Sequence, residues 1–206
     1  MQRWQLVSDA GIDGLELGDA EPSPPGPGQV QVRIDASSIN YRDLSTIENA
    51  AARGISYPFV PNSDGAGEIT DVGEGVTDFE VGDRVATCFF ENWTGGAISP
   101  TAMNTALGGA RPGVLARSVN LASTGVIHAP AHLSPEEVST LPCAALTAWH
   151  ALTEPRVNAP GETVLILGTG GVSVFAQQFC RLMGAQTIVT SSSDAKLARM
   201  RELGAN

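Results

Sequence analysis

Residues 164–179 constrain the fold of this chain most strongly. Residues 164–167 are four consecutive apolar residues, two of them β-branched, which is typical of a strand buried on both faces. A glycine turn follows, and apolar residues then recur over 172–179 at the i, i+3, i+4, i+7 spacing of an amphipathic helix. A strand, a glycine turn and a helix in this order predict a dinucleotide site. Gly168 would permit the turn, and Gly170 would let the backbone approach a pyrophosphate at the helix N-terminus.

The glycine fingerprint is incomplete. Gly171 follows Gly170 directly, and the sixth position of the Gly-x-Gly-x-x-Gly pattern holds Ser173 in place of glycine. A structural turn that binds no ligand is therefore the alternative interpretation of this motif.

The charge balance excludes one class of partner. The net charge is −10, and no basic stripe is present that could neutralise a phosphate backbone, so nucleic-acid binding is not expected. The chain is 42% hydrophobic and 17% charged, which is typical of a globular protein with a sizeable core. A length of 206 residues allows one large domain or one and a half ordinary ones.

The cysteines indicate the compartment. Cys88, Cys143 and Cys180 are widely separated and odd in number, and the sequence has no signal peptide, no long apolar run and no Cys-x-x-Cys pair. We therefore expect a cytoplasmic protein that does not enter a membrane.

The first part of the chain is predicted to form a small β-barrel, because short strand patterns recur between turns. These patterns lie at residues 4–7, 15–17, 30–34, 69–86, 113–121 and 125–128. Residues 88–112 interrupt them with a long irregular stretch, which we interpret as a lid or pocket wall or, alternatively, as a packed surface excursion.

The second part is predicted to alternate helices and strands. Ser134 and Glu137 form a capping box with Pro135 at the first helical position, and an apolar helix is expected over 143–152. After the glycine-turn helix, residues 187–190 form a second strand. Asp194 is expected to cap a last helix that ends at Gly204.

Six segments taken together resemble the medium-chain dehydrogenase/reductase superfamily, specifically its zinc-free, quinone-oxidoreductase-like alcohol dehydrogenase branch. They are residues 28–30, 40–43, 64–67, 81–85 and 141–149 and the glycine turn, and the resemblance covers the whole chain. It implies an α/β fold: a GroES-like β-barrel catalytic domain at residues 1–125, followed at 126–206 by the first half of a Rossmann doubly wound parallel sheet. It also implies an active site between the two domains and a homodimer.

The same resemblance allows a test for zinc. Where zinc-dependent relatives have a cysteine, a His-Glu pair and a second cysteine, this chain has Asn40, Ser63 with Asp64, and Cys143. One thiolate with a hydroxyl and an amide does not make a zinc site, which needs three protein ligands. The region of the structural-zinc lobe has only Cys88, so we predict no metal. Cys143 is then expected to be a small buried residue in a helix.

Without zinc, the oxygen of a hydride acceptor must be polarised by hydrogen bonds. The resemblance places Asn40 and Asp43 at the nicotinamide end of the active site, with Tyr41 as a possible donor, and these three are the candidate catalytic residues. Taken alone, the same residues could be a turn in which Asp43 caps a short helix. Thr147 matches the threonine that meets the nicotinamide carboxamide, although a helix hydroxyl bonded to its own backbone is the alternative.

Cofactor choice depends on the end of the second strand. An NAD-binding fold has an acidic residue about 20 residues past the glycines, whereas this chain has Ser192 there, beside Ser191 and near Lys196. Hydroxyls and a lysine can donate to a 2′-phosphate, so we expect NADPH rather than NADH, although Asp194 lies close by. The candidate cofactor residues are Thr147, Gly168, Gly170, Gly171, Val172, Ser191, Ser192 and Lys196.

The strand at 164–167 is expected to have a neighbour on one side only, because members of the superfamily run to well over 300 residues. Each of its side chains left exposed would forfeit roughly 1.5–3 kcal/mol. We therefore expect a piece of a longer chain rather than a short protein stabilised by a partner.

The expected activity is metal-free hydride transfer between NADPH and a quinone, enone or aldehyde, or the reverse oxidation of an alcohol. A non-catalytic half-Rossmann module that binds a partner is the competing class. The specific substrate is not predicted.

Overall fold

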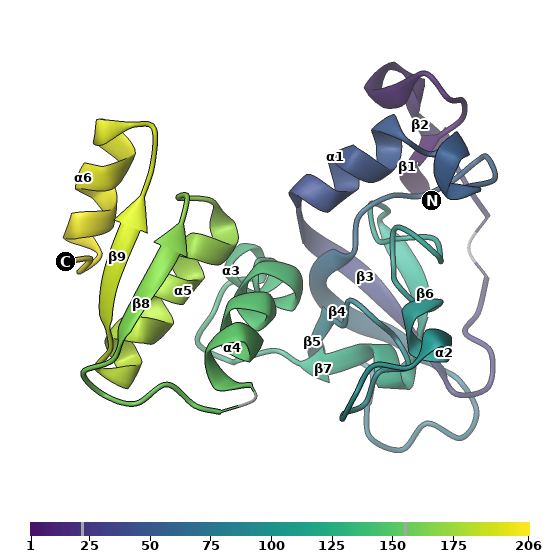
Figure 1. The fold of residues 1–206 in the computed structure, drawn as a ribbon. Helices are drawn as coiled ribbons and strands as arrows, with labels where there is room; N and C mark the ends of the chain where they lie inside the picture. Colours follow the sequence, from purple (N-terminus) through teal and green to yellow (C-terminus); the bar gives the residue numbers. More distant parts are fainter. Residues whose placement is uncertain (22, 155) are drawn as a thin grey trace. The chain divides into compact units, whose positions relative to one another are not determined.

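The structure is a computed structural model that describes residues 1–21, 23–154 and 156–206, and these divide into two compact units, Met1–Pro142 and Cys143–Asn206. Figure 1 labels the helices and strands. Unit 1 contains β1 (Gln2–Leu6), η1 (Gly11–Gly14), β2 (Leu15–Asp19), β3 (Gln29–Ser38), α1 (Tyr41–Glu48), η2 (Ala51–Arg53), β4 (Asp64–Val72), β5 (Arg84–Thr87), α2 (Pro100–Met103), β6 (Ser118–Ala122), η3 (Ser123–Gly125), β7 (Val126–His128) and α3 (Pro135–Ser139). A π-helical turn, η4 (Leu141–Ala145), spans the boundary, and unit 2 contains α4 (Leu146–Thr153), β8 (Thr163–Leu167), α5 (Gly171–Met183), β9 (Gln186–Thr190) and α6 (Asp194–Glu202).

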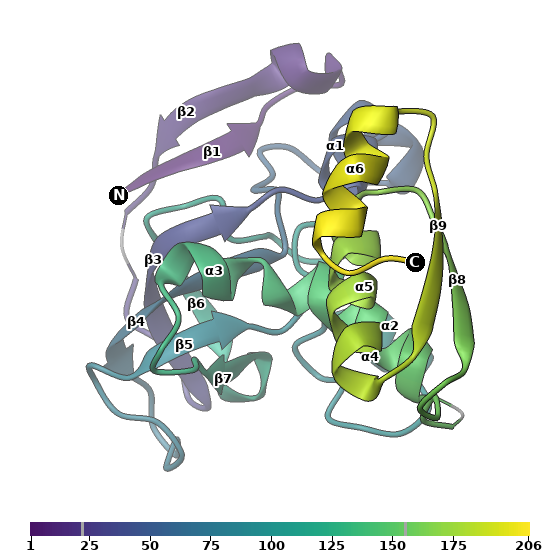
Figure 2. The ribbon, with the colours of Figure 1, turned by 90° about the vertical axis from the view of Figure 1, so that its left-hand side faces the viewer.

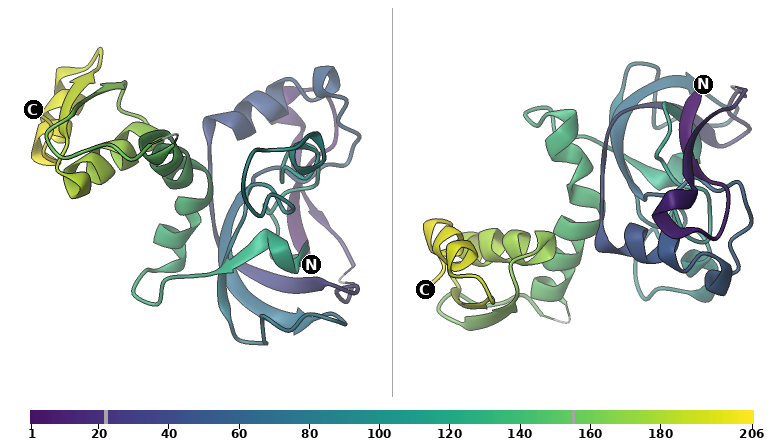
Figure 3. Two further views of the ribbon diagram at one scale, coloured as in Figure 1. Left: turned by 60° about the horizontal axis from the view of Figure 1, so that its bottom comes forward. Right: turned by 90° about the horizontal axis from the view of Figure 1, so that it is seen from above.

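Unit 1 is built on a five-stranded antiparallel sheet with the order β6-β3-β4-β5-β7, beside a separate hairpin of β1 and β2. The predicted strands are confirmed except in residues 73–83 and 113–117, which form turns and irregular backbone. The sheet is strongly curved (Figure 3). One source of curvature is a register shift between Ile34 and Ala36, opposite Gly67. A Cβ on Gly67 would lie 1.8 Å from the carbonyl oxygen of Arg33, so only glycine fits at this close approach.

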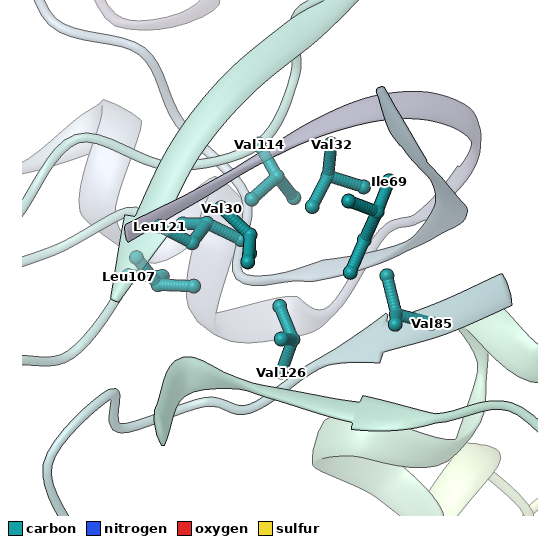
Figure 4. Close-up of a cluster of buried hydrophobic side chains, with 8 residues drawn as sticks. All are labelled: Val30, Val32, Ile69, Val85, Leu107, Val114, Leu121 and Val126. Atoms are coloured by element: carbon teal, nitrogen blue, oxygen red, sulfur yellow. The ribbon is translucent and has the colours of Figure 1, made fainter. Parts of the chain in front are cut away.

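The core of unit 1 lies inside this curved sheet. Eight buried apolar side chains from the strands and from the segment before β6 point toward one another (Figure 4). They are Val30, Val32, Ile69, Val85, Leu107, Val114, Leu121 and Val126. Since burying an aliphatic side chain contributes roughly 1.5–3 kcal/mol, this cluster is the main stabilising feature of the unit.

The boundary between the units falls later than the sequence-based division at 125/126. The strand β7 pairs with β5, and α3 packs against β3 and β4, so both elements belong to unit 1. The helix start before α3 is confirmed: the Ser134 hydroxyl accepts from Glu137 N at 3.3 Å, and Glu137 Oε2 accepts from Ser134 N at 2.9 Å.

Unit 2 has the predicted strand, glycine turn, helix, strand and helix. The strands β8 and β9 pair in parallel, and α5 and α6 lie on the same face of this pair (Figure 2). The α/β fold class is therefore confirmed. The cap predicted for the last helix is wrong, because Ser193 is the N-cap of α6 and its Oγ accepts from Lys196 N at 3.4 Å. Asp194 is the first helical residue.

The opposite face of the β8–β9 pair is bare. Leu165, Leu167 and Ile188 are 60%, 73% and 54% exposed, whereas Ile166, which faces the helices, is 5% exposed. Within the described residues β8 pairs only with β9. The expected open strand edge is therefore present among these residues.

Among the helices that the structure describes, none combines the length and the apolar character that crossing a membrane would require.

Candidate functional site

The candidate residues fall into two groups, one in each unit. In unit 1, Asn40, Tyr41 and Asp43 lie at the start of α1, directly after β3 and a short connection. Asn40 is the N-cap of the helix, and the Asp43 carboxylate reaches back so that its Oδ2 accepts from Asn40 N at 2.8 Å. Tyr41 is 86% exposed, whereas Asp43 is 1% exposed. The helix therefore brings Asn40 and Asp43 together and directs Tyr41 to the surface of the unit.

Asp43 is an unusual helix-terminal carboxylate because it is buried. Burial raises its pKa, the hydrogen bond from Asn40 N and the charge of Arg42 oppose that rise, and the charge of Asp64 adds to it. Its second oxygen, Oδ1, has no hydrogen-bond partner in the described part of the chain and lies 3.8 Å from Arg42 Nε. Asn40 Nδ2 is likewise buried without a partner among these residues. A buried donor and a buried acceptor are thus both available in one turn of backbone.

A second set of buried polar groups lies at the start of β4. Ser63 and Asp64 are fully buried, and Ser63 Oγ donates to Asp64 Oδ1 at 2.5 Å. The Thr87 hydroxyl donates to Ser63 O at 2.8 Å and accepts from Gly65 N at 2.9 Å. These bonds satisfy groups that would otherwise be costly to bury, and they commit the Ser63 hydroxyl to Asp64.

The irregular stretch at 88–112 is fastened at its base. Leu107 N donates to Phe89 O at 3.0 Å, and the buried Glu91 accepts from Ala122 N at 2.9 Å and pairs with Arg111 at 3.3 Å. The rings of Phe89, Phe90 and Trp93 follow one another in edge-to-face contacts at the beginning of the stretch. The base of this segment is therefore fixed to the barrel.

In unit 2 the glycine turn has the geometry that its sequence predicts. Gly168 has φ +80°, which favours glycine, and Gly170 is the N-cap of α5. Among the described residues no side chain caps this helix, and a Cβ built on Gly168 or Gly170 would meet nothing within 4 Å. The N–H groups of Gly171, Val172 and Ser173 begin this helix of 13 residues. Ser173, in the position of the third glycine, donates through Oγ to Leu167 O at 3.1 Å.

The end of β9 lies beside this turn, because Gly168 N donates to Thr190 Oγ1 at 3.3 Å. Ser192 and Lys196 are exposed, whereas Ser191 is half-buried and its Oγ accepts from Ser193 N at 3.2 Å. Carboxyl ends of parallel strands are where α/β sheets bind ligands. The glycine turn and the serines at 191–193 therefore lie together at the carboxyl ends of β8 and β9.

Thr147 lies on α4, which packs against α5, and it is exposed. Val172 is 40% exposed at the first turn of α5, and a Cβ on Gly171 would lie 3.5 Å from Ala144 Cβ. Cys143, expected to be a small buried residue in a helix, is half-buried and lies in the π-helical turn η4.

The barrel carries a known family signature. The model of the alcohol dehydrogenase GroES-like domain matches residues 26–131, which is about half of the chain. The chain belongs to the medium-chain dehydrogenase/reductase superfamily.

Relatives within this superfamily extend the likeness into unit 2. A zinc-type alcohol dehydrogenase-like protein of Schizosaccharomyces pombe is 46% identical over 199 residues, which cover 95% of this chain and 58% of the relative. A quinone oxidoreductase of Pseudomonas aeruginosa is 31% identical and covers 99% of this chain and 57% of its own length. A crystal structure described as an alcohol dehydrogenase of Sinorhizobium meliloti 1021 superposes with a TM-score of 0.93 at 42% identity, over 99% of this chain and 60% of that one. This chain thus spans somewhat more than half the length of these superfamily members.

Three contacts in this dehydrogenase-like chain had no signal in the sequence. Thr190 binds the glycine turn, Ser173 ties α5 to β8, and Arg42 reaches residues 107 and 108. Arg42 stands inside the Asn-Tyr-Arg-Asp motif, but its partners lie more than sixty residues away along the chain. Only the tertiary structure brings them together.

Proposed function

We propose that this protein is an NADPH-dependent oxidoreductase that transfers hydride between NADPH and a quinone, an enone or an aldehyde, or oxidises the corresponding alcohol, without a metal ion. The observation that supports the proposal most is the uncapped N-terminus of α5, with open space at Gly168 and Gly170. A free helix N-terminus behind a glycine turn is a site for a dinucleotide pyrophosphate.

The residues available for the nucleotide fit NADPH. The backbone N–H groups of Gly170, Gly171 and Val172 would hold the pyrophosphate, and Ser191, Ser192 and Lys196 would hold the 2′-phosphate. Asp194 is the argument for NADH, because it does not cap α6 and its carboxylate is therefore not occupied in that way. Against it, Ser192 occupies the position at which NAD-binding folds have an acidic residue.

The donor set supports a reaction without zinc. Asn40 offers an amide, the Ser63 hydroxyl is committed to Asp64, and Cys143 is the one thiol among these positions. No three His, Cys, Asp or Glu side chains come together as a metal-binding group within residues 1–21, 23–154 and 156–206. The S. pombe relative is named zinc-type, and that name concerns the relative.

The chemistry proposed for unit 1 is to hold the substrate oxygen. When bound, the nicotinamide supplies or accepts the hydride. Asn40 Nδ2 is a buried donor with no partner among the described residues, so it would donate to that oxygen as negative charge develops on it. Tyr41 is exposed and would offer a second hydroxyl donor, and Asp43 fixes the Asn40 backbone. Asp43, whose pKa burial raises, is the third candidate for contact with the substrate oxygen. Thr147 is proposed to meet the carboxamide.

A screen of quinones, enones and aldehydes that follows NADPH oxidation tests this function. Asn40→Ala should lower kcat by roughly 100-fold or more, as removal of one oxyanion donor does. Asn49→Ala is the matched control, because Asn49 stands at the other end of α1 and its side chain donates only to Ser45 O among the described residues. Loss of the same size in both variants, or no turnover by a folded wild type, would contradict the proposal.

The competing proposal is a non-catalytic half-Rossmann module that binds a partner. The bare face of the β8–β9 pair favours it, because Leu165, Leu167 and Ile188 are exposed together. It predicts no nucleotide binding by a folded sample. A homodimer and a cytoplasmic location belong to the enzymatic proposal, and sedimentation and cell fractionation test them.

A further inference from the structure

The planar guanidinium group of Arg42 makes three kinds of contact. Its Nη1 and Nη2 donate to the carbonyl oxygens of Gly108 and Leu107, both at 2.6 Å. Its guanidinium carbon lies 4.4 Å from the centre of the Phe89 ring, and its Nε lies 3.8 Å from Asp43 Oδ1. The side chain, 24% exposed, thus contacts both ends of the 88–112 segment and the buried carboxylate of α1.

The guanidinium is suited to this position for a physical reason. Only arginine offers a rigid fork of donors that can serve two carbonyls while its face lies over an aromatic ring. The chain also fits around it, because a Cβ on Gly109 would lie 3.0 Å from Nη1. Lysine would keep the positive charge but lose the paired donors and the stacking.

Other contacts besides those of Arg42 hold the base of the segment together. Leu107 N already donates to Phe89 O, Phe90 and Ala106 form a β-bridge, and Arg111 pairs with Glu91. What Arg42 adds to these contacts is the connection between the closed base of the segment and α1. That connection ends on the carboxylate that also fixes Asn40.

We propose that Arg42 is a positioning residue that couples the 88–112 segment to the Asp43 carboxylate, so that the placement of this segment and the charge facing Asp43 are set together. Its consequence for turnover rests on the function proposed above. While the segment holds the guanidinium in place, a positive charge faces Asp43 Oδ1. The other groups that act on Asp43 are the Asn40 backbone N–H and the Asp64 carboxylate.

Four variants of the full chain separate this coupling from a merely structural role. Arg42→Ala removes the fork and the charge, and Arg42→Lys restores the charge alone. Arg111→Ala loosens the same segment from its Glu91 side without touching Asp43. Arg84→Ala is the control: it removes another guanidinium of unit 1, which donates to Ala131 O and Leu133 O.

Two readouts need no activity: amide exchange at Leu107, and the titration of the Asp43 carboxyl carbon by NMR. Arg42→Ala should speed exchange about 5–10-fold, the effect of losing roughly 1 kcal/mol of hydrogen bonding, and move the Asp43 midpoint upward. Arg42→Lys should speed exchange but return the midpoint toward wild type. Arg111→Ala should speed exchange and, because the loosened segment holds the guanidinium less firmly, move the Asp43 midpoint upward by less than Arg42→Ala does. Arg84→Ala should change neither.

An unchanged Asp43 midpoint in Arg42→Ala would overturn the coupling, and so would an unchanged midpoint in Arg111→Ala although its exchange at Leu107 has become faster. If Arg42→Ala does not fold, Arg42→Lys and Arg42→Gln give the same comparison of charge. In an active enzyme, Arg42→Ala should also raise KM and displace the pH–rate profile, with the profile recovered in Arg42→Lys. A wild type that never oxidises NADPH would contradict the proposed function, but the Asp43 titration would still test the coupling.

Discussion

The strand β3 of unit 1 and the strand β8 of unit 2 differ in how far their side chains are buried. In unit 1, β3 has a neighbour on each side, and its inward side chains Val30 and Val32 are fully buried. In unit 2, β8 has one neighbour among the described residues, and Leu165 and Leu167 are 60% and 73% exposed. In sequence β8 (TVLIL) is more apolar than β3 (QVQVRIDASS), so the greater exposure of β8 comes from what covers it and not from its composition. Strand composition alone does not bury a strand.

This difference bears on function because each unit carries one of the two groups of candidate residues. The polar groups at the start of α1 stand on a barrel with a closed core, whereas the glycine turn stands at the end of a two-stranded sheet covered on one face. We therefore expect the turn to be the less rigid half. The following predictions test that comparison, from the largest expected effect to the smallest.

The first prediction compares the same substitution in the two units. Leu121→Ala, at a side chain that is 3% exposed in the barrel core, should lower the free energy of unfolding by roughly 2–5 kcal/mol. Leu165→Ala, on the bare face of β8, should cost less than about 1 kcal/mol. Denaturant unfolding with amide exchange resolved for each unit measures both. Equal costs would mean that the face of β8 is covered.

The second prediction separates a phosphate site from a structural turn. Gly170→Asp supplies a better helix cap than glycine and has room for its Cβ, so α5 should be unchanged or slightly more stable. The added carboxylate would occupy the place of the pyrophosphate and repel it, which should weaken NADPH binding about 100-fold or more. Thermal unfolding and calorimetry on the same sample give the two values. Retained binding would show that the turn does not hold phosphate.

The third prediction concerns the end of β9. Ser192→Asp should shift preference from NADPH toward NADH by about tenfold, because a carboxylate repels a 2′-phosphate and accepts from a 2′-hydroxyl. Ser56→Asp, at an exposed serine of unit 1, makes the same charge change as a control. The ratio of the two dissociation constants is the measurement, and an unchanged ratio would remove the argument from Ser192 and Lys196.

The smallest effect is a pH dependence in unit 1. Because burial raises the pKa of Asp43 in the folded state, the folded chain holds a proton that the unfolded chain has lost. Stability should therefore fall as pH rises from the ordinary aspartate value through the raised one. Asp43→Asn should flatten this slope, and Asp71→Asn, at an exposed residue, should leave it in place. Denaturant midpoints across mildly acidic pH check the sign.

Local patterns predicted much of the fold because their physics is local. The capping box at Ser134 and Glu137 and the strand, turn and helix around Gly168 depend on residues within a few positions of one another. The prediction of Asp194 rather than Ser193 as the cap of α6 was wrong because adjacent residues compete for one helix end, and the sequence pattern does not separate them. The hydrogen bonds from Arg42 to residues 107 and 108 depend on how the barrel closes, and no local sequence pattern predicts that.

The open edge of β8 was predictable by a different route. A run of four apolar residues predicts a strand buried on both faces, and the sequence offers it a strand neighbour on one side only. The candidate site divides in the same way: the glycine turn and Asn40 follow from motifs, whereas the Thr190 contact and the sealed Ser63–Asp64 pair follow from tertiary packing.

Calorimetric titration of the folded chain with NADPH and NADH, side by side, tests the central claim most directly. The proposed function predicts measurable heat with NADPH, weaker binding of NADH, and loss of both in Gly170→Asp. A folded sample that takes up neither nucleotide would contradict the account, and tighter binding of NADH would contradict its assignment of the cofactor.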